Sequence, residues 1–176
     1  MKIRFDVNNA EGRSALIRAG LGEALASLAR ESQANWGGFT AAQMVEHLLW
    51  GFEISTGRLT VAAATSEEWQ QKARVFLHDR RPMPRGFENP LLRDGLPPLR
   101  FGSLPEAVSS LAGEARLFLE LSSSDPQSRR IHPVFGACSV EEWSRIHFKH
   151  CVHHFLQFSL VEVDEGIVSL SSHLRK

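Results

Sequence analysis

Four short segments of the sequence share the pattern that commonly starts an α-helix. Each has Ser or Thr followed three positions later by Glu or Gln, and the segments are Thr40–Gln43, Thr65–Glu68, Ser103–Glu106 and Ser139–Glu142. In such a capping box the hydroxyl accepts a hydrogen bond from a backbone N–H of the first turn, and the Glu or Gln bonds back to the cap residue. An apolar stretch with helical spacing follows each box, so the chain is expected to be mainly helical.

The apolar spacing extends these starts into four long helices and a short one. The long helices are expected over residues 10–31, 40–56, 104–122 and 139–161, and the short one over 66–78. Four amphipathic helices in 176 residues predict an all-α fold, a four-helix bundle in a single domain over residues 1–176. Two strand predictions accompany it: "KIRFDV" alternates, and "VEVDEGIVSL" is typical of two strands joined by a turn.

Charge and apolar content argue against several classes of protein. Lys and Arg together number 20, and so do Asp and Glu, so no basic field indicates a nucleic-acid partner. No apolar run reaches the roughly 20 residues that cross a bilayer, and the first residues lack the apolar core of a signal peptide. Two cysteines, Cys138 and Cys151, make no disulfide framework. We therefore expect a cytoplasmic protein with no nucleic-acid or membrane partner.

One short segment, "KHCVHHFLQF" at residues 149–158, holds three of the eight histidines. On a helix His150 and His154 lie one turn apart on the same face, and His153 lies beside that face. The expected second helix places His47 on its apolar face. Two facing helices could thus offer three imidazoles to one ion and leave a coordination position open, as in catalytic zinc sites. The alternative is a set of hydrogen-bonded core histidines without a metal.

Two longer segments, "NWGGFTAAQMVEHLLW" and "IHPVFGACSVEEWSRIHFKHCVHHFLQF", resemble an uncharacterised bacterial branch of the DinB-like (YfiT-like) superfamily. That branch has a Trp-Gly-x-Met-Thr start to its second helix, followed by Gln-Met-x-x-His. It also has a His-Pro-x-Phe-Gly loop and a last helix with Lys-His-x-x-His-His-x-x-Gln-Phe. The present sequence departs from this pattern at Phe39, where Met is usual, and at Cys151, where an aliphatic residue is usual.

The resemblance implies a four-helix bundle that holds one divalent metal ion. Its ligands carry over to His47, His150 and His154, and zinc or nickel is the ion expected for three imidazoles. His153 is expected to form hydrogen bonds near the ligands or between helices rather than to bind the ion. His147, one turn before His150, is expected to line the mouth of the site.

Three further residues belong to the same matched segments. Gln157 is expected to bridge helices as donor and acceptor, and Trp36 to close one end of the bundle. His132 precedes a proline, and it either packs its loop or reaches the site. Cys151 is expected to fill apolar space, and Cys138, just before the last helix, could have a lowered pKa.

The resemblance also implies a metal-dependent enzyme that acts on a small molecule. Two chemistries fit: transfer of a low-molecular-weight thiol, with the thiol as co-substrate, or hydrolysis. Glu46 is a poor candidate for a base, because it lies about 100° from His47 around the helix. The alternative is a non-catalytic, metal-stabilised bundle that binds a small ligand or a protein partner. A homodimer formed by packing of two bundles is also expected.

The long segment 79–102 connects the second and third long helices after the short one. It contains five prolines and three glycines, which exclude a helix, and its Leu and Phe residues favour packing against the bundle. Between positions 80 and 100 it carries five arginines against one Glu and one Asp. Two interpretations stay open: a solvated linker, or a loop beside the metal cleft whose arginines bind an anionic substrate.

Overall fold

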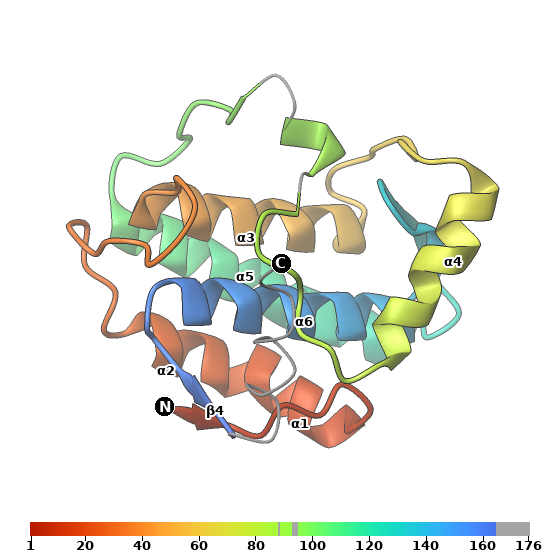
Figure 1. The fold of residues 1–176 in the computed structure, drawn as a ribbon, viewed down its shortest axis with the longest axis horizontal. Coiled ribbons are helices and arrows are strands. Elements are labelled where there is room, and N and C mark those ends of the chain that lie inside the picture. The colour runs from red at the N-terminus through yellow and green to blue at the C-terminus, as the bar shows by residue number, and fades with distance from the viewer. Residues whose placement is uncertain (88, 93–94, 165–176) are drawn as a thin grey trace, which may run out of the picture.

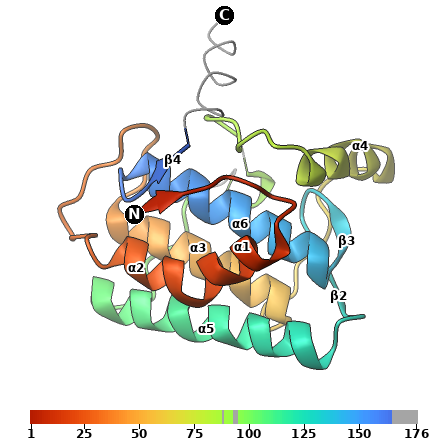
Figure 2. The same ribbon diagram turned by 90° about the horizontal axis from the view of Figure 1, so that it is seen from below.

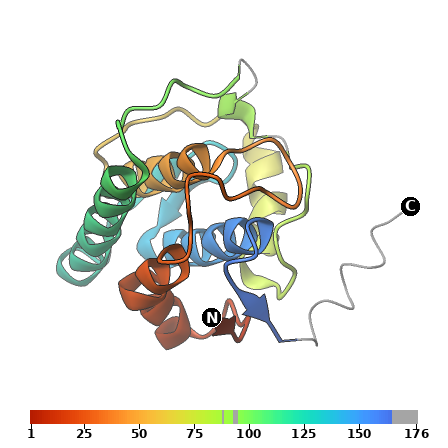
Figure 3. The same cartoon turned by 90° about the vertical axis from the view of Figure 1, so that its left-hand side faces the viewer.

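Four helical rods lie side by side (Figures 1 and 3) and enclose a shared apolar core. The computed structural model describes residues 1–87, 89–92 and 95–164. The rods are α1 (Ala10–Ala15) continued by the π-helical η1 (Leu16–Gly20) and α2 (Leu21–Leu25), then α3 (Ala41–Thr56), α5 (Leu104–Ser124) and α6 (Val140–Gln157). The expectation of a mainly helical fold is confirmed.

The core lies between the rods, and every rod contributes its apolar face to it. The side chains buried in this one cluster include Leu21, Leu48, Phe52, Leu111, Phe118, Phe148 and Phe155. Burial of one such side chain is worth about 1.5–3 kcal/mol relative to leaving it in water. The apolar stripes therefore fix which faces of α3 and α6 point inward, and with them the direction of the histidines on those faces.

Three of the four predicted capping boxes are present. Both hydrogen bonds of the box form at Thr40, Ser103 and Ser139. The fourth start is displaced by one residue, because Ser66 rather than Thr65 caps α4 (Glu67–His78) and its Oγ accepts from the backbone N–H of Trp69. The Thr65 side chain instead bonds the loop of the hairpin, where its hydroxyl donates to the carbonyl oxygen of Val134 at 2.9 Å.

The first rod stops earlier than the predicted helix over 10–31, and residues 26–40 form a loop. This loop bonds to the C-terminal end of α6. The backbone N–H of Asn35 donates to the carbonyl oxygen of Gln157 at 2.8 Å, and its side-chain amide donates to Ser159 Oγ at 2.8 Å. Such bonds give polar groups an alternative to the helix, so the loop is held over the end of α6 instead.

Two small strand pairs complete the fold. β1 (Lys2–Ile3) pairs in parallel with β4 (Glu162–Val163), so the chain after α6 returns to the N-terminal strand (Figure 2). α6 ends before residue 161, since Ser159 turns the backbone with a φ of 56°. The second strand predicted in "VEVDEGIVSL" falls outside the described residues. The second pair is an antiparallel hairpin of β2 (Arg129–His132) and β3 (Gly136–Ser139), which was not predicted from the sequence.

Helix α4 stands beside the other helices (Figure 1). Two cationic side chains, Arg74 and Lys149, join it to its neighbours. Arg74 of α4 donates to two carbonyl oxygens of the β2–β3 hairpin, at 3.0 and 2.6 Å. Lys149 of α6 is fully buried and donates to the carbonyl oxygens of Phe76 and Arg81, at 2.6 and 2.7 Å. These polar contacts fix the position of α4 relative to the bundle.

The connection that follows α4 passes across α6 in Figure 1 and is irregular, as predicted. It contains one short 3-10 turn, η2 (Pro90–Leu92). Its last part returns to α3, where the backbone N–H of Arg100 donates to the Glu46 carboxylate at 2.9 Å and the guanidinium bonds Glu53 at 3.0 Å. The start of the connection is therefore bonded to α6 and its end to α3, the two helices that carry His47, His150 and His154.

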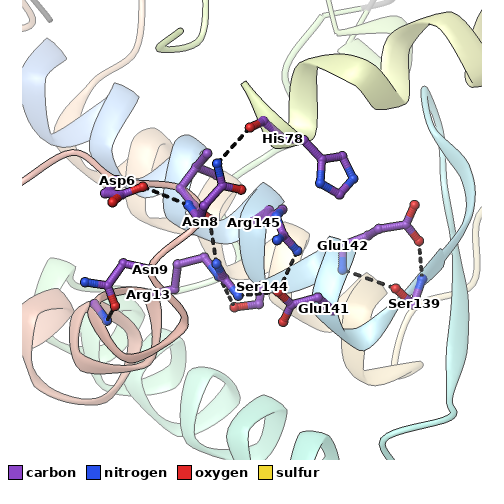
Figure 4. A network of polar contacts seen from close by, with 12 residues as sticks. Asp6, Asn8, Asn9, Arg13, His78, Ser139, Glu141, Glu142, Ser144 and Arg145 are labelled. Atoms are coloured by element: carbon purple, nitrogen blue, oxygen red, sulfur yellow. Dashed lines mark hydrogen bonds and ion pairs between the residues drawn. The ribbon is translucent and has the colours of Figure 1, made fainter. Parts of the chain in front are cut away.

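A buried arginine ties the N-terminal segment to the first turns of α6 (Figure 4). Arg13 is almost fully buried, and its guanidinium donates to Val7 O at 2.5 Å, Ser144 Oγ at 3.1 Å and Glu141 Oε1 at 2.5 Å. Close by, the Asn8 side chain donates to the carbonyl oxygen of His78 at 3.0 Å. This network holds the first turns of α6 to the N-terminal segment and α1.

Among the described residues, no helix combines the length and the apolar character that crossing a membrane requires.

Candidate metal centre

Helices α3 and α6 bring three imidazoles together at one point. His150 Nε2 lies 2.9 Å from His47 Nε2 and 3.1 Å from His154 Nε2, and the three ligand atoms all lie within 4.8 Å of one another. Tetrahedral zinc with ligands at about 2.0–2.1 Å places its nitrogen ligands about 3.3 Å apart. The three histidines are therefore close enough to bind one metal ion.

The local sequence explains this convergence. His150 and His154 are one turn apart in α6, so their side chains project from the same face. His47 projects from α3, which packs beside α6. Gly51, one turn after His47, faces the opposing ring, and a Cβ at that position would lie 3.6 Å from His150 Nδ1, an ordinary van der Waals distance.

Burial keeps the three imidazoles neutral. Desolvation, with a smaller effect of His153, lowers the pKa of His47 to about 4. Desolvation, followed by the neighbouring imidazoles, also holds the pKa values of His150 and His154 well below the ordinary value. A neutral imidazole has one nitrogen lone pair available for a metal. The environment therefore favours the protonation state that binds an ion.

Hydrogen bonds fix the orientation of the His154 ring. The Gln157 side-chain NH₂ donates to the carbonyl oxygen of Trp36 at 2.7 Å, so its oxygen faces His154 Nδ1, also at 2.7 Å. Because that oxygen is only an acceptor, Nδ1 must carry the proton and Nε2 is left with its lone pair toward the centre. This partner outside the ligand set is typical of metal-binding histidines.

The three-histidine cluster has more acceptor atoms than its own protons satisfy. His150 Nε2 takes part in both short contacts, and one proton on it can be donated to only one of them. His47 Nδ1 is buried without a hydrogen-bond partner among the described residues. Phe39 stacks on His47 with ring centroids 5.1 Å apart and meets His154 edge-on at 5.5 Å, so an apolar ring covers the cluster on that side. A shared cation would satisfy all three inward nitrogens at once.

A cavity of about 910 Å³ adjoins the cluster, and all three histidines line it. Its other walls come from α4, from the connection after α4 and from the β2–β3 hairpin. A second hollow of about 380 Å³ shares His47, Trp50 and Leu92 with it. Among the described residues, the group of possible ligands contains only the three histidines. The cluster can therefore offer three protein ligands to an ion that a small molecule could reach.

Two neighbouring histidines lie outside the ligand group. His153 donates from Nδ1 to the carbonyl oxygen of Met83 at 3.3 Å and meets the ring of Trp36 edge-on. His147 is buried, stacks on Phe52 with ring centroids 3.7 Å apart and bonds Ser55 Oγ at 2.8 Å. It lines the inner wall of the cavity rather than its mouth, and burial lowers its pKa to about 3.

His132 and Trp36 also line the cavity, and His132 is outside the group of possible ligands. His132 Nδ1 accepts from the backbone N–H groups of Val134 and Phe135, at 3.0 and 3.3 Å, so this side chain organises the hairpin turn. Burial lowers its pKa to about 3. Trp36 is half-buried, and the Arg85 guanidinium lies 3.9 Å from the centre of its ring.

The arginines of the connection are engaged mainly with carboxylates of the protein. Arg81 bonds Asp79 at 2.7 Å, and Arg100 bonds Glu53 as described above. Arg80 lies 3.9 Å from Asp6. Arg93 falls outside the described residues. The connection does border the cavity, but of its arginines within the described part only Arg81 lines it.

The two cysteines are buried and unpaired with each other. Desolvation, with a smaller effect of Glu142, raises the pKa of Cys138 to about 12, so the expectation of a lowered pKa at the start of the last helix is wrong. Burial raises the pKa of Cys151 to about 12 as well, in line with a side chain that fills apolar space. Neither thiol belongs to the group of possible metal ligands.

The role of α4 in the cavity wall was not predicted from the sequence. Trp69, Ala73, Phe76 and Leu77 line it, at the spacing of one helical face. That spacing was visible as an apolar stripe, but an apolar stripe is expected to pack against a core, and only the position of α4 shows that it faces a cavity instead.

No protein-family model matches this chain, and no curated protein matches it either. The assignment of a function therefore depends on the geometry and the chemistry of the site.

Proposed function

We propose that this protein is a divalent-metal-binding enzyme of the DinB-like (YfiT-like) four-helix-bundle type. The observation that carries the proposal is the convergence of three Nε2 atoms, from His47, His150 and His154, at the wall of a large cavity. Three imidazoles with an accessible further position are the arrangement of catalytic rather than structural zinc sites. The packing of the two ligand helices in one bundle supports the same proposal.

The donor set fits zinc or nickel. Imidazole nitrogen suits both ions, whereas calcium and magnesium prefer oxygen ligands. A bound zinc or nickel ion would supply Lewis acidity, which favours the deprotonated form of a thiol or of water. The chain itself contributes ring orientation through Gln157, an apolar cover through Phe39 and an enclosed volume for a substrate.

Of the two chemistries, thiol transfer fits the cavity wall better than hydrolysis. Among the described residues that line the cavity there is no Asp or Glu to act as a general base for water, which leaves that role to Lys149 and to imidazoles outside the ligand group such as His153. In thiol transfer the substrate brings its own nucleophile: the sulfur forms a bond to an electrophilic carbon, the leaving group departs with the bonding electron pair, and the thiol proton passes to solvent. The co-substrate would be a low-molecular-weight thiol.

The test measures turnover of an electrophile, 1-chloro-2,4-dinitrobenzene, by zinc- or nickel-loaded protein with and without added glutathione. We expect release of chloride above the uncatalysed rate only when both metal and thiol are present, and none from the His150→Ala variant. Thiol-independent hydrolysis of an ester such as 4-nitrophenyl acetate, lost in the same variant, would instead favour the hydrolase reaction.

One observation favours a second candidate, a non-catalytic bundle stabilised by its metal. The three histidines join α3 to α6 across the core, so an ion there would cross-link two rods. In that case removal of the ion by a chelator would unfold the protein. A catalytic site predicts that the chelated protein loses activity and keeps its far-ultraviolet circular dichroism.

A further inference from the structure

We propose that the cavity beside the three histidines binds an elongated, mainly apolar molecule whose anionic end lies at the histidine cluster. This inference names a substrate class, and it rests on the proposed function where it places an ion between that end and the histidines. It draws on the length of the cavity, the composition of its wall, the contacts that hold it open and its charges.

The cavity is long because it follows one face of α6. Residues of this helix from Trp143 to Gln157 line it, which is fourteen steps of about 1.5 Å each, or about 21 Å along the axis. The histidine cluster occupies the half of this face that runs from His150 to Gln157. The other half, seven steps or about 10 Å along the axis, extends from the cluster toward Trp143 and the β2–β3 hairpin.

The wall in that direction is apolar. Leu77 and Phe76 of α4, Val134 and Phe135 of the hairpin, and Ile146 of α6 all line it. The volume of about 910 Å³ is at the upper end of the range for small-molecule sites, which bury most of the ligand against apolar and aromatic side chains. A ligand that fills this part of the cavity binds more tightly, because its own apolar surface is removed from water.

Hydrogen bonds keep the apolar wall from collapsing onto the bundle. Arg74 holds α4 to the hairpin, and Lys149 holds the end of α4 and the start of the connection to α6. Asn8 holds the carbonyl oxygen of His78 at the last residue of α4. The apolar face of α4 thus stands opposite the bundle across a volume that apolar side chains would otherwise fill.

The charged groups around the cavity indicate where the anionic end of the ligand lies. Arg81 and Lys149 are the charged residues of the wall within the described part of the chain, and both are bonded to Asp79 and to other groups of the protein. Three neutral imidazoles leave the charge of a divalent ion uncompensated. An anionic group is therefore favoured at the histidine cluster, and the apolar remainder is favoured beyond it.

The test is a chain-length series of alkyl hydroxamates, from acetohydroxamate to decanohydroxamate, titrated calorimetrically into zinc- or nickel-loaded protein. A hydroxamate supplies the anionic, metal-binding end, and the alkyl chain supplies the apolar part. Affinity is expected to rise about threefold to fourfold for each methylene that enters the cavity. Equal affinities along the series would overturn the proposal.

Two matched variants locate the alkyl chain. Ala73 of α4 lines the cavity, whereas Val75 of the same helix is 66% exposed and does not. Ala73→Trp is expected to weaken decanohydroxamate binding at least tenfold and to leave metal content and acetohydroxamate binding unchanged. Val75→Trp adds the same ring on the outer face and is expected to change neither affinity. A loss of decanohydroxamate binding that is equal in the two variants would overturn the assignment of the cavity.

The same series of chain lengths, titrated as carboxylates into metal-free protein, separates this inference from the proposed function. Tighter binding of decanoate than of acetate to a protein that takes up no metal would refute the metal centre and support the apolar cavity. If the protein binds metal but has equal affinity for long and short chains, the proposed metal centre would stand and the proposed apolar ligand would be refuted. Decanohydroxamate that binds metal-free and metal-loaded protein equally would refute the placement of the anionic end at the cluster.

Discussion

The side-chain amide of Gln157 bonds two groups that lie far apart in the sequence. Its oxygen faces His154 Nδ1, and its NH₂ group donates to the carbonyl oxygen of Trp36, each at 2.7 Å. The first bond sets the tautomer of His154, and the second holds the loop over the end of α6. At the scale of single residues, Gln157 therefore links the histidine cluster to the loop that covers it.

Replacement of Gln157 separates these two roles. Gln157→Met removes both bonds, and we expect zinc affinity to fall about 10–100-fold, the usual effect of losing a partner that orients a metal-binding histidine. Gln157→Glu keeps an acceptor for His154 Nδ1 and loses the donor to Trp36, so it should retain most of the affinity. Competition with a zinc-chelating dye measures both variants. Equal losses in the two would contradict the role of the acceptor in orienting His154.

At this scale the sequence predicts ligand candidates better than their surroundings. The spacing of His150 and His154, together with an apolar face that includes His47, made a shared site possible, and the family resemblance selected these three residues as the ligands. The same face suggested that His147 lies at the mouth, but its Nε2 bonds Ser55 inside the core. Helical spacing gives the direction of a side chain around the axis, and it does not give the depth of packing at each turn.

At the scale of helices and strands, α4 differs from the four rods because polar contacts determine its position. The capping pattern and the apolar spacing predicted α4 to within one residue, but the partner of its apolar face depends on long-range contacts such as that of Arg74 with the hairpin. The hairpin itself was missed, because its strands of four residues each are too short for a clear alternating pattern. Local signals therefore predicted the helices, and long-range hydrogen bonds arranged the cavity wall.

The buried Lys149 offers a test of these polar contacts. Its ammonium group bonds two carbonyl oxygens and lies 3.3 Å from Asp79. Lys149→Met leaves those oxygens without a donor, and we expect it to lower the free energy of unfolding by about 2–3 kcal/mol. Lys72→Met removes a lysine whose partner Glu68 is also exposed, so it should change stability by less than about 1 kcal/mol. Urea denaturation compares the two variants, and similar small effects would contradict the structural role of Lys149.

At the scale of the whole molecule, the site assembles from segments that are distant in the chain. The loop before α3, helices α3 and α6, the connection after α4 and the hairpin all line one cavity. Several of the imidazoles in these segments are buried and have lowered pKa values, including His132 and His147, both at about 3. The stability of the metal-free fold is therefore coupled to pH.

The sign of this coupling follows from His132. Its folded pKa of about 3 lies below its unfolded value of about 6.5, so the unfolded chain binds the extra proton between those values. The neutral ring contributes its full share to the free energy of unfolding above about pH 6.5. This share decreases as pH falls, by about 1.4 kcal/mol per pH unit. His132→Asn keeps an acceptor for the turn and cannot titrate. Urea denaturation between about pH 7.5 and about pH 5 should show wild type losing stability faster than the variant, and parallel losses would contradict a buried neutral ring at this position.

The central claim is that His47, His150 and His154 bind one divalent ion. The most direct measurement is the metal content of purified, dialysed protein by elemental mass spectrometry. We expect about one zinc or nickel ion per chain, loss of that ion in His150→Ala, and retention in His153→Ala, which removes an adjacent imidazole of the same helix that lies outside the ligand group. A wild-type protein without bound metal after loading, or a site emptied by His153→Ala and kept by His154→Ala, would contradict the claim.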